Sequence, residues 1–360
     1  MHLALVALMM LPVSAWAGGP YARTQAWALA EPVPVKQYAE DWQGPLQRGS
    51  DGLALIEAET GWQADGWVAG WVWQRQYVIR ASRDTAVLYH LSKNDAPAPA
   101  NREFHLNLHA NTYEARGLRL GRVLSDEPIS GWHLEWTPSL VIWRGDLHED
   151  GRLTGTATSN ASGALSYNAD LAHFYSEDPL LDRRIERPDG RGASLDLSAR
   201  LSIREQWVLD LQVRNLLARM WWSQAPYTLG ELRSDTRQTD SQGNVNFRPS
   251  LSGFEGQESH RQRLPLHAQV RARRALGHWG GAHHAELGLT QTELERYWDV
   301  GWGMTRGEWQ AGLRYIPQAS HALGLRLGWR QLQLDWAADH WRWERAHHVQ
   351  LNLSLAWQLP

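Results

Sequence analysis

The chain has 360 residues, no cysteine and a formal net charge of -3 at pH 7. The length suits one large β domain or two smaller domains, and the near-neutral charge gives no support for a nucleic-acid partner. The absence of cysteine excludes disulfide frameworks and thiolate metal sites. Tryptophan is unusually frequent, with 22 Trp against 4 Phe. Its apolar ring and polar N–H suit a boundary between lipid and water, and aromatic-rich clefts in a soluble protein are the alternative.

The N-terminus carries a short apolar run, Leu3 to Trp16, which ends in Ala15-Trp16-Ala17. This pattern is typical of a signal peptide with an A-x-A cleavage site, so residues 1–17 are predicted to be removed after Ala17. A membrane anchor or a buried first strand are the alternatives. No later segment approaches the ~18 uninterrupted apolar residues of a transmembrane helix.

Residues 18–65 show poor periodicity and are interrupted by Pro32, Pro34 and Pro45. We expect this region to be a periplasmic lead-in, a plug in a barrel lumen, or one early strand around Leu53–Glu59.

From residue 66 to residue 360, apolar residues recur at every second position. A period of two indicates β-strands, because successive side chains of a strand point to opposite faces. The clearest segments are 104–111, 165–172, 195–203, 266–273 and 349–359. The sequence therefore predicts an all-β fold in which each strand has one apolar face and one polar face.

Two short connections fix the register of neighbouring strands. A loop at Arg204–Gln206 sets three apolar pairs side by side: Ile203 with Trp207, Leu201 with Leu209, and Ala199 with Leu211. A turn at Arg330-Gln331 does the same for Trp329 with Leu332, Leu327 with Leu334, and Leu325 with Trp336. In both hairpins the apolar faces agree, as a barrel requires.

Other connections are predicted from local chemistry. Glu149-Asp150-Gly151 has the composition of a hairpin turn, which would bring Leu147 close to Leu153. The strand that starts at Trp207 loses its parity near Asn215, which indicates a bulge. Ser176–Arg191 and Leu229–Leu264 read as long polar loops. If the short turns face the periplasm, both long loops lie outside the cell.

These features resemble a Gram-negative outer-membrane β-barrel protein. The resemblance rests on the signal segment, the alternation, and the motif Leu351-x-Leu353-x-Leu355-x-Trp357. It implies an antiparallel transmembrane β-barrel of about 14 strands, with 12 and 16 as the neighbouring even counts. It also implies an outer-membrane location, a lipid bilayer as partner, and recognition of this motif by the barrel-assembly machinery. The size is similar to that of long-chain fatty-acid transporters, but their Asn-Pro-Ala motif is absent, so no family is assigned.

No catalytic or metal-binding motif stands out. The sequence has no G-x-S-x-G and no H-E-x-x-H. The pairs His283-His284 and His347-His348 are adjacent in sequence, so in a strand their side chains face opposite sides and do not share one metal. We therefore predict no metal, no cofactor and no catalytic residue, although an enzyme remains one of the alternatives.

Charged residues on the polar face of the predicted strands are candidates for lining the lumen. They are Asp196, Arg200, Asp210, Arg214, Arg271, Arg273, Arg326 and Asp335. Two interpretations are open: a structural salt-bridge network that fills the lumen, or a lining that selects solutes by charge.

Two further groups are predicted to lie at the membrane surface. Arg183, Arg184 and Arg187 would bind lipopolysaccharide phosphates, with a solvated loop as the alternative. Trp309, Trp329 and Trp357 are predicted to form a girdle at the periplasmic interface.

Three classes of function remain. The first is passage or transport of a small or hydrophobic solute. The second is a structural or assembly barrel that holds a periplasmic partner through residues 18–65. The third is a barrel enzyme that acts on lipid or peptide. A continuous water path through the lumen would favour the first class, and a lumen filled by side chains would favour the second.

The signal segment and the alternation generate a prediction of compartment. We expect the protein to fractionate with the outer membrane, with a mature N-terminus at Gly18, as measured by cell fractionation and N-terminal sequencing. Recovery in the soluble periplasmic fraction without detergent would contradict it.

Overall fold

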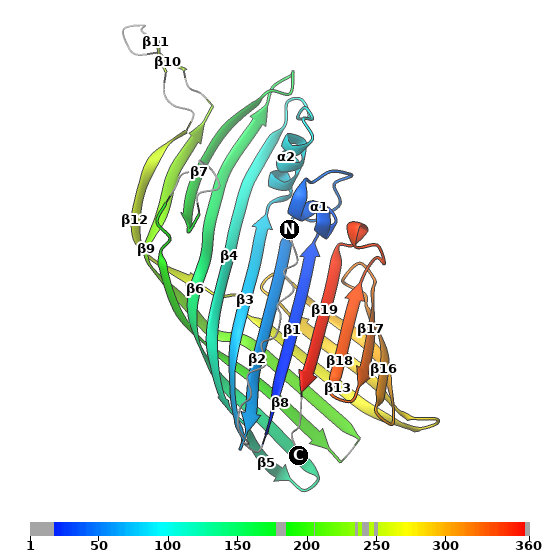
Figure 1. Ribbon diagram of the computed structural model, residues 1–360. Helices are drawn as coiled ribbons and strands as arrows, with labels where there is room; N and C mark the ends of the chain where they lie inside the picture. The colour runs from blue at the N-terminus through cyan, green and yellow to red at the C-terminus, as the bar shows by residue number, and fades with distance from the viewer. Residues whose placement is uncertain are drawn as a thin grey trace.

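The computed structural model describes residues 18–177, 185–204, 206–234, 237–239, 245–247 and 251–356. Most of these residues lie in antiparallel strands, as the two-residue period predicts. The first strand, β1 (Gly18–Ala30), pairs with the last, β19 (His348–Ala356), so the sheet closes on itself (Figure 1). The predicted all-β closed barrel is therefore confirmed.

The other elements follow in chain order. The first half contains α1 (Val35–Glu40), β2 (Gly52–Ala64), β3 (Trp67–Ala81), α2 (Arg83–Lys93), β4 (Glu103–Arg122), β5 (Leu124–Ile129), β6 (Trp132–Ser159) and β7 (Leu165–Tyr175). The second half contains β8 (Asp189–Ile203), β9 (Trp207–Arg233), β10 (Arg237–Thr239), β11 (Val245–Phe247), β12 (Leu251–Arg263), β13 (His267–His278), β14 (Ala282–Gln291), β15 (Arg296–Arg306), β16 (Trp309–Ile316), β17 (Ala322–Trp329), β18 (Leu332–Ala338) and the 3-10 turn η1 (Trp343–Arg345).

The barrel has 14 strand positions within the described residues. The main sheet has 17 strands, but three of them share a position with a neighbour. β5 forms a short hairpin with the start of β6. β7 and β8 lie end to end between β6 and β9, and β12 and β13 lie end to end along β9. The predicted count of about 14 is confirmed.

Both predicted hairpin registers are confirmed. Across the turn at Arg204, Ile203 pairs with Trp207, and the pairs Leu201–Leu209 and Ala199–Leu211 follow. Across the turn at Arg330, Trp329 pairs with Leu332, and the pairs Leu327–Leu334 and Leu325–Trp336 follow. Arg204 and Arg330 adopt positive φ values of 47° and 54°, so neither turn needs glycine to reverse the chain.

Residues 18–30 and 52–64 are strands of the barrel, which corrects the expected lead-in or plug at residues 18–65. β1 pairs with β19 on one edge and with β2 on the other. The side of β1 opposite to Arg23 carries only small side chains such as Ala22, Thr24 and Ala26, so its apolar signal is weak. The early strand expected around Leu53–Glu59 is part of β2.

Two predicted connections are wrong. Glu149-Asp150-Gly151 is not a turn, because β6 runs through it for 28 residues; Gly151 instead admits the ring of His173, 3.0 Å from where a Cβ would lie. Most of Leu229–Leu264 is strand, since β9 extends to Arg233 and β12 begins at Leu251. The connection predicted at Ser176–Arg191 lies between β7, which ends at Tyr175, and β8, which begins at Asp189, and these two strands lie end to end on the same side of the barrel.

Strand β9 has two residues in the left-handed backbone conformation. Each lies close to a point where the neighbouring position of the barrel passes from one strand to the next. Asn215 has φ 56° and Gln224 has φ 53°. Residues 224–226 of β9 lie level with the break between β7 and β8. Residues 215–218 lie level with the break between β12 and β13. The bulge predicted near Asn215 is confirmed by the register shift there.

One side of the barrel rises well above the rest, at the end away from the short turns (Figure 1). We call this extension the wing; it comprises the upper parts of β4, β6 and β9 together with β7 and β12. Helix α2 packs against it through Val87, Leu88 and Leu91, which contact a buried group that includes Phe104 and Ala157. Ser82 begins this helix by accepting a hydrogen bond from the Thr85 backbone N–H. In the part of the chain that the structure describes, no helix is long and apolar enough to span a bilayer.

Below the wing, the outer surface of the barrel is apolar. Large exposed side chains on this surface include Leu118, Ile142, Leu217, Leu313 and Leu323. A closed barrel with an apolar exterior and a polar interior is the architecture of an outer-membrane β-barrel, and the chain has this architecture.

The apolar exterior predicts a contrast between neighbouring residues of β19. Leu353 is 43% exposed and faces lipid, whereas Ser354 faces the lumen, where Arg23 of β1 is its register partner. Leu353→Arg should cost ~2–4 kcal/mol, the penalty for a charge on the lipid face near mid-membrane. Ser354→Asp is the control and should be mild, because its carboxylate faces the lumen beside Arg23, its register partner on β1. Equal effects of the two substitutions in refolding titrations into lipid vesicles would show that the faces are assigned wrongly.

Candidate functional site: the charged lumen

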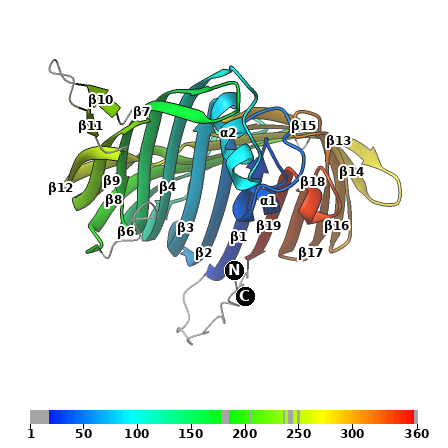
Figure 2. The same ribbon diagram turned by 90° about the horizontal axis from the view of Figure 1, so that it is seen from above.

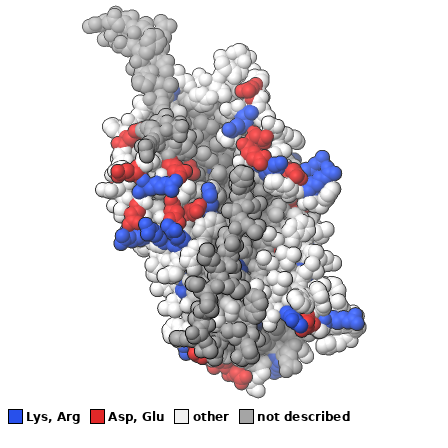
Figure 3. Space-filling view, in the orientation of Figure 1, with Lys and Arg blue, Asp and Glu red and all other residues white. Residues whose placement is uncertain are grey.

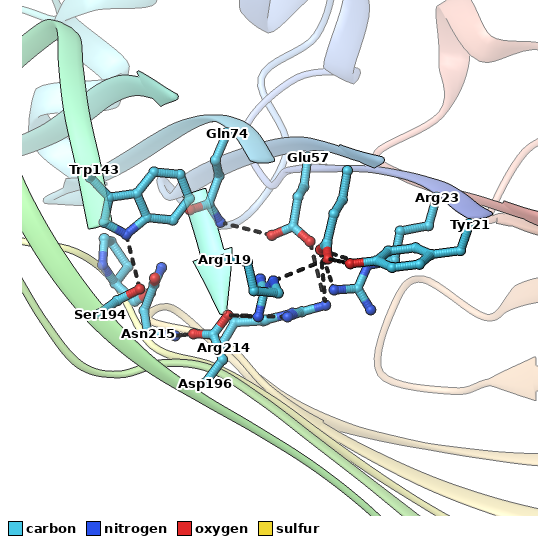
Figure 4. A network of polar contacts seen from close by, with 12 residues as sticks. Tyr21, Arg23, Glu57, Gln74, Arg119, Trp143, Ser194, Asp196, Arg214 and Asn215 are labelled. Carbon is cyan, nitrogen blue, oxygen red and sulfur yellow. Dashed lines mark hydrogen bonds and ion pairs between the residues drawn. The ribbon is translucent and has the colours of Figure 1, made fainter. Parts of the chain in front are cut away.

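Six charged side chains meet inside the barrel from both of its walls (Figure 4). This first charge cluster contains Arg23 (β1), Glu57 and Glu59 (β2), Arg119 (β4), Asp196 (β8) and Arg214 (β9). The Arg119 side chain is 3% exposed and the Glu59 side chain is 0% exposed. Three positive and three negative groups balance one another, as buried charges require.

Arginines bridge the acids of this cluster. Arg119 Nε lies 3.1 Å from Glu59 Oε1, and its Nη1 lies 2.7 Å from Asp196 Oδ2. Arg214 Nη1 donates to Asp196 Oδ2 at 3.1 Å, and its Nη2 lies 3.6 Å from Glu57 Oε1. Because β9 and β2 are five strand positions apart, the Arg214–Glu57 contact crosses the lumen.

Neutral groups complete the hydrogen bonding of the acids. Tyr21 donates its hydroxyl to Glu59 at 2.7 Å. The backbone N–H of Asn215 donates to Asp196 Oδ1 at 2.9 Å, and this N–H is free of the ladder because Asn215 is the bulge residue of β9. The bulge thus positions a donor for the buried carboxylate.

A second charge cluster lies along β13 to β18. It contains Arg271, Glu286, Asp299, Arg314, Arg326 and Asp335, again three positive and three negative groups. Arg326 Nη2 lies 3.0 Å from Asp335 Oδ2, and Arg314 also pairs with Asp335. Arg314 reaches further and donates to Gln350 Oε1 at 3.0 Å.

Between the two clusters, the opposite walls of the barrel touch. Trp27 on β1 and His267 on β13 have ring centroids 5.0 Å apart, although these strands are seven positions apart in either direction. Trp27 also packs edge-on against Tyr297 at 5.4 Å, within a buried apolar group that includes Leu53 and Ile316. Figure 2 shows from above that the barrel is wider than it is deep. This flattening brings the walls close enough for side chains of opposite walls to touch.

All eight residues predicted to line the lumen make ion pairs. Asp196 and Arg214 belong to the first cluster, and Arg271, Arg326 and Asp335 belong to the second. The remaining three form a separate group in which Asp210 pairs with Arg200 and Arg273. Arg200 has a side chain that is 60% exposed, so this group lies at an open mouth of the barrel.

Sequence reasoning missed about half of the clustered charges. Arg23, Glu57 and Glu59 lie in the segment read as a lead-in or plug. Arg119 stands between Leu118 and Leu120, and this alternation is a signal that could have identified it.

The predicted interface residues are partly described. Trp309 and Trp329 pair across β16 and β17 and are exposed, with ring centroids 6.2 Å apart. Trp357 lies outside the described residues, as do Arg183 and Arg184. Arg187 is described and forms an exposed ion pair with Glu177. The described residues contain no group of three or more His, Asp or Glu side chains that could hold a metal ion.

No protein-family model matches the sequence, and no curated protein matches it significantly. Among solved structures, the β domain of the Bordetella autotransporter BrkA is 13% identical, with 95% of this chain and 100% of that chain covered and a TM-score of 0.27. The CymD monoaromatic hydrocarbon channel is 10% identical, with 95% and 88% covered and a TM-score of 0.25. OccAB2 of Acinetobacter baumannii is 9% identical, with 95% and 98% covered and a TM-score of 0.15. The chain resembles outer-membrane β-barrel proteins in architecture, and these loose superpositions assign no family.

The first cluster predicts unequal roles for two lumen arginines. Arg119→Met leaves two buried carboxylates short of a partner, so it should lower the free energy of unfolding by about 3–5 kcal/mol. Arg200→Met is the matched control: it also removes an ion pair, but an exposed one, and should cost less than about 1 kcal/mol. Urea unfolding of the barrel in lipid vesicles, followed by tryptophan fluorescence, measures both. Equal costs would show that the buried network does not stabilise the fold.

Proposed function

We propose that this protein is a sealed outer-membrane barrel with a structural role, which holds its wing outside the membrane as a platform. The observation that carries the proposal is the contact between Trp27 and His267, which joins opposite walls of the barrel. A pore that conducts continuously keeps its walls apart and its lumen hydrated.

The two charge clusters support the same proposal. Each has equal numbers of positive and negative groups, and their side chains pair with one another. A lining that selects anions or cations presents an excess of one sign to the solute. Balanced, buried and mutually bonded charges instead stabilise a filled interior.

The length of the wing strands supports a role outside the membrane. β6 has 28 residues and β9 has 27, whereas a tilted transmembrane strand needs about 9–11. More than half of each strand is therefore available to build a folded surface beyond the bilayer, to which α2 adds a helix.

Passage of a small or hydrophobic solute is the second candidate. It is favoured by the fact that the contact between Trp27 and His267 is made by side chains, which can rotate. Rotation of Trp27 and exchange of partners within the clusters would open a path without unfolding a strand.

Conductance in planar lipid bilayers tests the proposal. We expect the native protein to show no steady ion current at low voltage. Trp27→Ala combined with His267→Ala should create a measurable current, because it removes the contact between the walls. Trp309→Ala combined with Trp329→Ala is the matched control and should stay silent, since those rings lie on the outer surface. A steady current through the native protein would reject the sealed barrel in favour of passage.

A further inference from the structure

Three arginines stand side by side on the outer surface of the barrel. Arg116 on β4 is the register partner of Arg144 on β6, and Arg144 is the register partner of Arg191 on β8. We call these three residues the arginine row. All three are exposed, and in Figure 3 charged side chains gather on the left of the molecule, above a largely uncharged band.

The row concentrates positive charge. Like charges directly opposite one another in a sheet are destabilising, and Arg144 has such a neighbour on both sides. Arg116 is partly compensated by Asp146 at 3.2 Å, and Arg191 by Asp189 at 3.0 Å. Arg144 makes no ion pair with any residue that the structure describes. The middle of the row therefore lacks a counter-charge from the described residues.

The row lies at the upper border of the apolar surface. The next outward residue below each arginine is apolar: Leu118, Ile142 and Ala193 respectively. On β6 the outward positions from Leu134 to Ile142 carry no charge, and the eleven residues from Leu134 to Arg144 match the length of a tilted transmembrane strand. The row therefore lies where the outer headgroups meet the acyl chains.

Aromatic residues and a hollow complete the surface. Trp73 is the register partner of Arg116 at one end, and Trp221 is the partner of Arg191 at the other. A hollow of about 650 Å³ is lined by Trp143, Arg144, Asp189 and Arg191. Among the described residues, its polar lining contains two guanidinium groups and one carboxylate, with a net positive charge.

We propose that the arginine row binds the phosphate of a phosphorylated, acylated lipid in the outer leaflet. Guanidinium groups bind phosphate through two parallel N–H···O bonds, and a phosphate beside Arg144 relieves the repulsion along the row. The apolar surface directly below favours a lipid over a soluble phosphate, because the acyl chains of the same molecule lie against Leu118 and Ile142. This inference does not depend on whether the lumen is sealed.

The test measures lipid retention by the full-length barrel in phosphatidylcholine nanodiscs doped with bisphosphorylated lipid A. Arg144→Gln combined with Arg191→Gln should lower retention at least tenfold relative to the native protein. Arg306→Gln combined with Arg330→Gln removes two arginines at the short-turn end and should leave retention unchanged. Arg144→Lys combined with Arg191→Lys keeps the charge but loses the paired geometry, and should retain an intermediate amount.

Two further measurements keep the outcome unambiguous. Folding of every variant is checked by its heat-modifiable mobility on a gel, so that lost retention is not lost structure. Dephosphorylated lipid A should be retained no better by the native protein than by the Gln variant. Equal retention of bisphosphorylated lipid A by both would overturn the proposal. Displacement of the lipid by millimolar inorganic phosphate would also overturn it, by showing a site for free phosphate.

Discussion

A backbone that crosses a membrane must pair every N–H and C=O internally, because the hydrocarbon offers no partner. This constraint explains why the first and last described strands meet: β1 and β19 pair over nine positions, from Tyr21 to Leu29. Without that seam the sheet would have two open edges in lipid. Closure of 14 strands in turn creates an interior, into which the inward-facing side chains of every strand project.

The barrel is flattened, and side chains from its opposite walls meet in the interior. Trp27 meets His267 across the short axis, and a charge cluster occupies the space on each side of this contact. Taking six charges out of water is costly, and the cost is offset only where the geometry and the neutral donors are both good. The hydroxyl of Tyr21 and the backbone N–H of Asn215 supply such donors. The same bulge that interrupts the ladder of β9 thus completes the hydrogen bonding of the lumen.

The alternation of apolar and polar residues on the two sides of a turn depends only on residues close in sequence. This alternation predicted the registers at Arg204 and Arg330 as well as the bulge at Asn215. It failed where a strand lacks an apolar face. β1 exposes mainly small side chains, and β12 is polar on both faces, so each was read as irregular chain. The lumen contacts were beyond sequence reasoning for a different reason. Parity shows which side of its own strand Trp27 or Arg214 occupies, but not which distant strand the flattened barrel brings opposite to it.

The two breaks beside β9, one between β7 and β8 and one between β12 and β13, weaken the connection between the wing and the membrane-embedded part of the barrel. The strand position between β6 and β9 is interrupted between β7 and β8, and the position on the other side of β9 is interrupted between β12 and β13. In contrast, β4, β6 and β9 continue into the wing without a break. Fewer continuous hydrogen-bond ladders therefore join the wing to the membrane-embedded part than run through either one. Cooperative units in proteins tend to divide where such connections are sparse. We therefore expect the wing to behave as a separate foldon, with amides that exchange with solvent through sub-global opening while the lipid-embedded ladder stays closed.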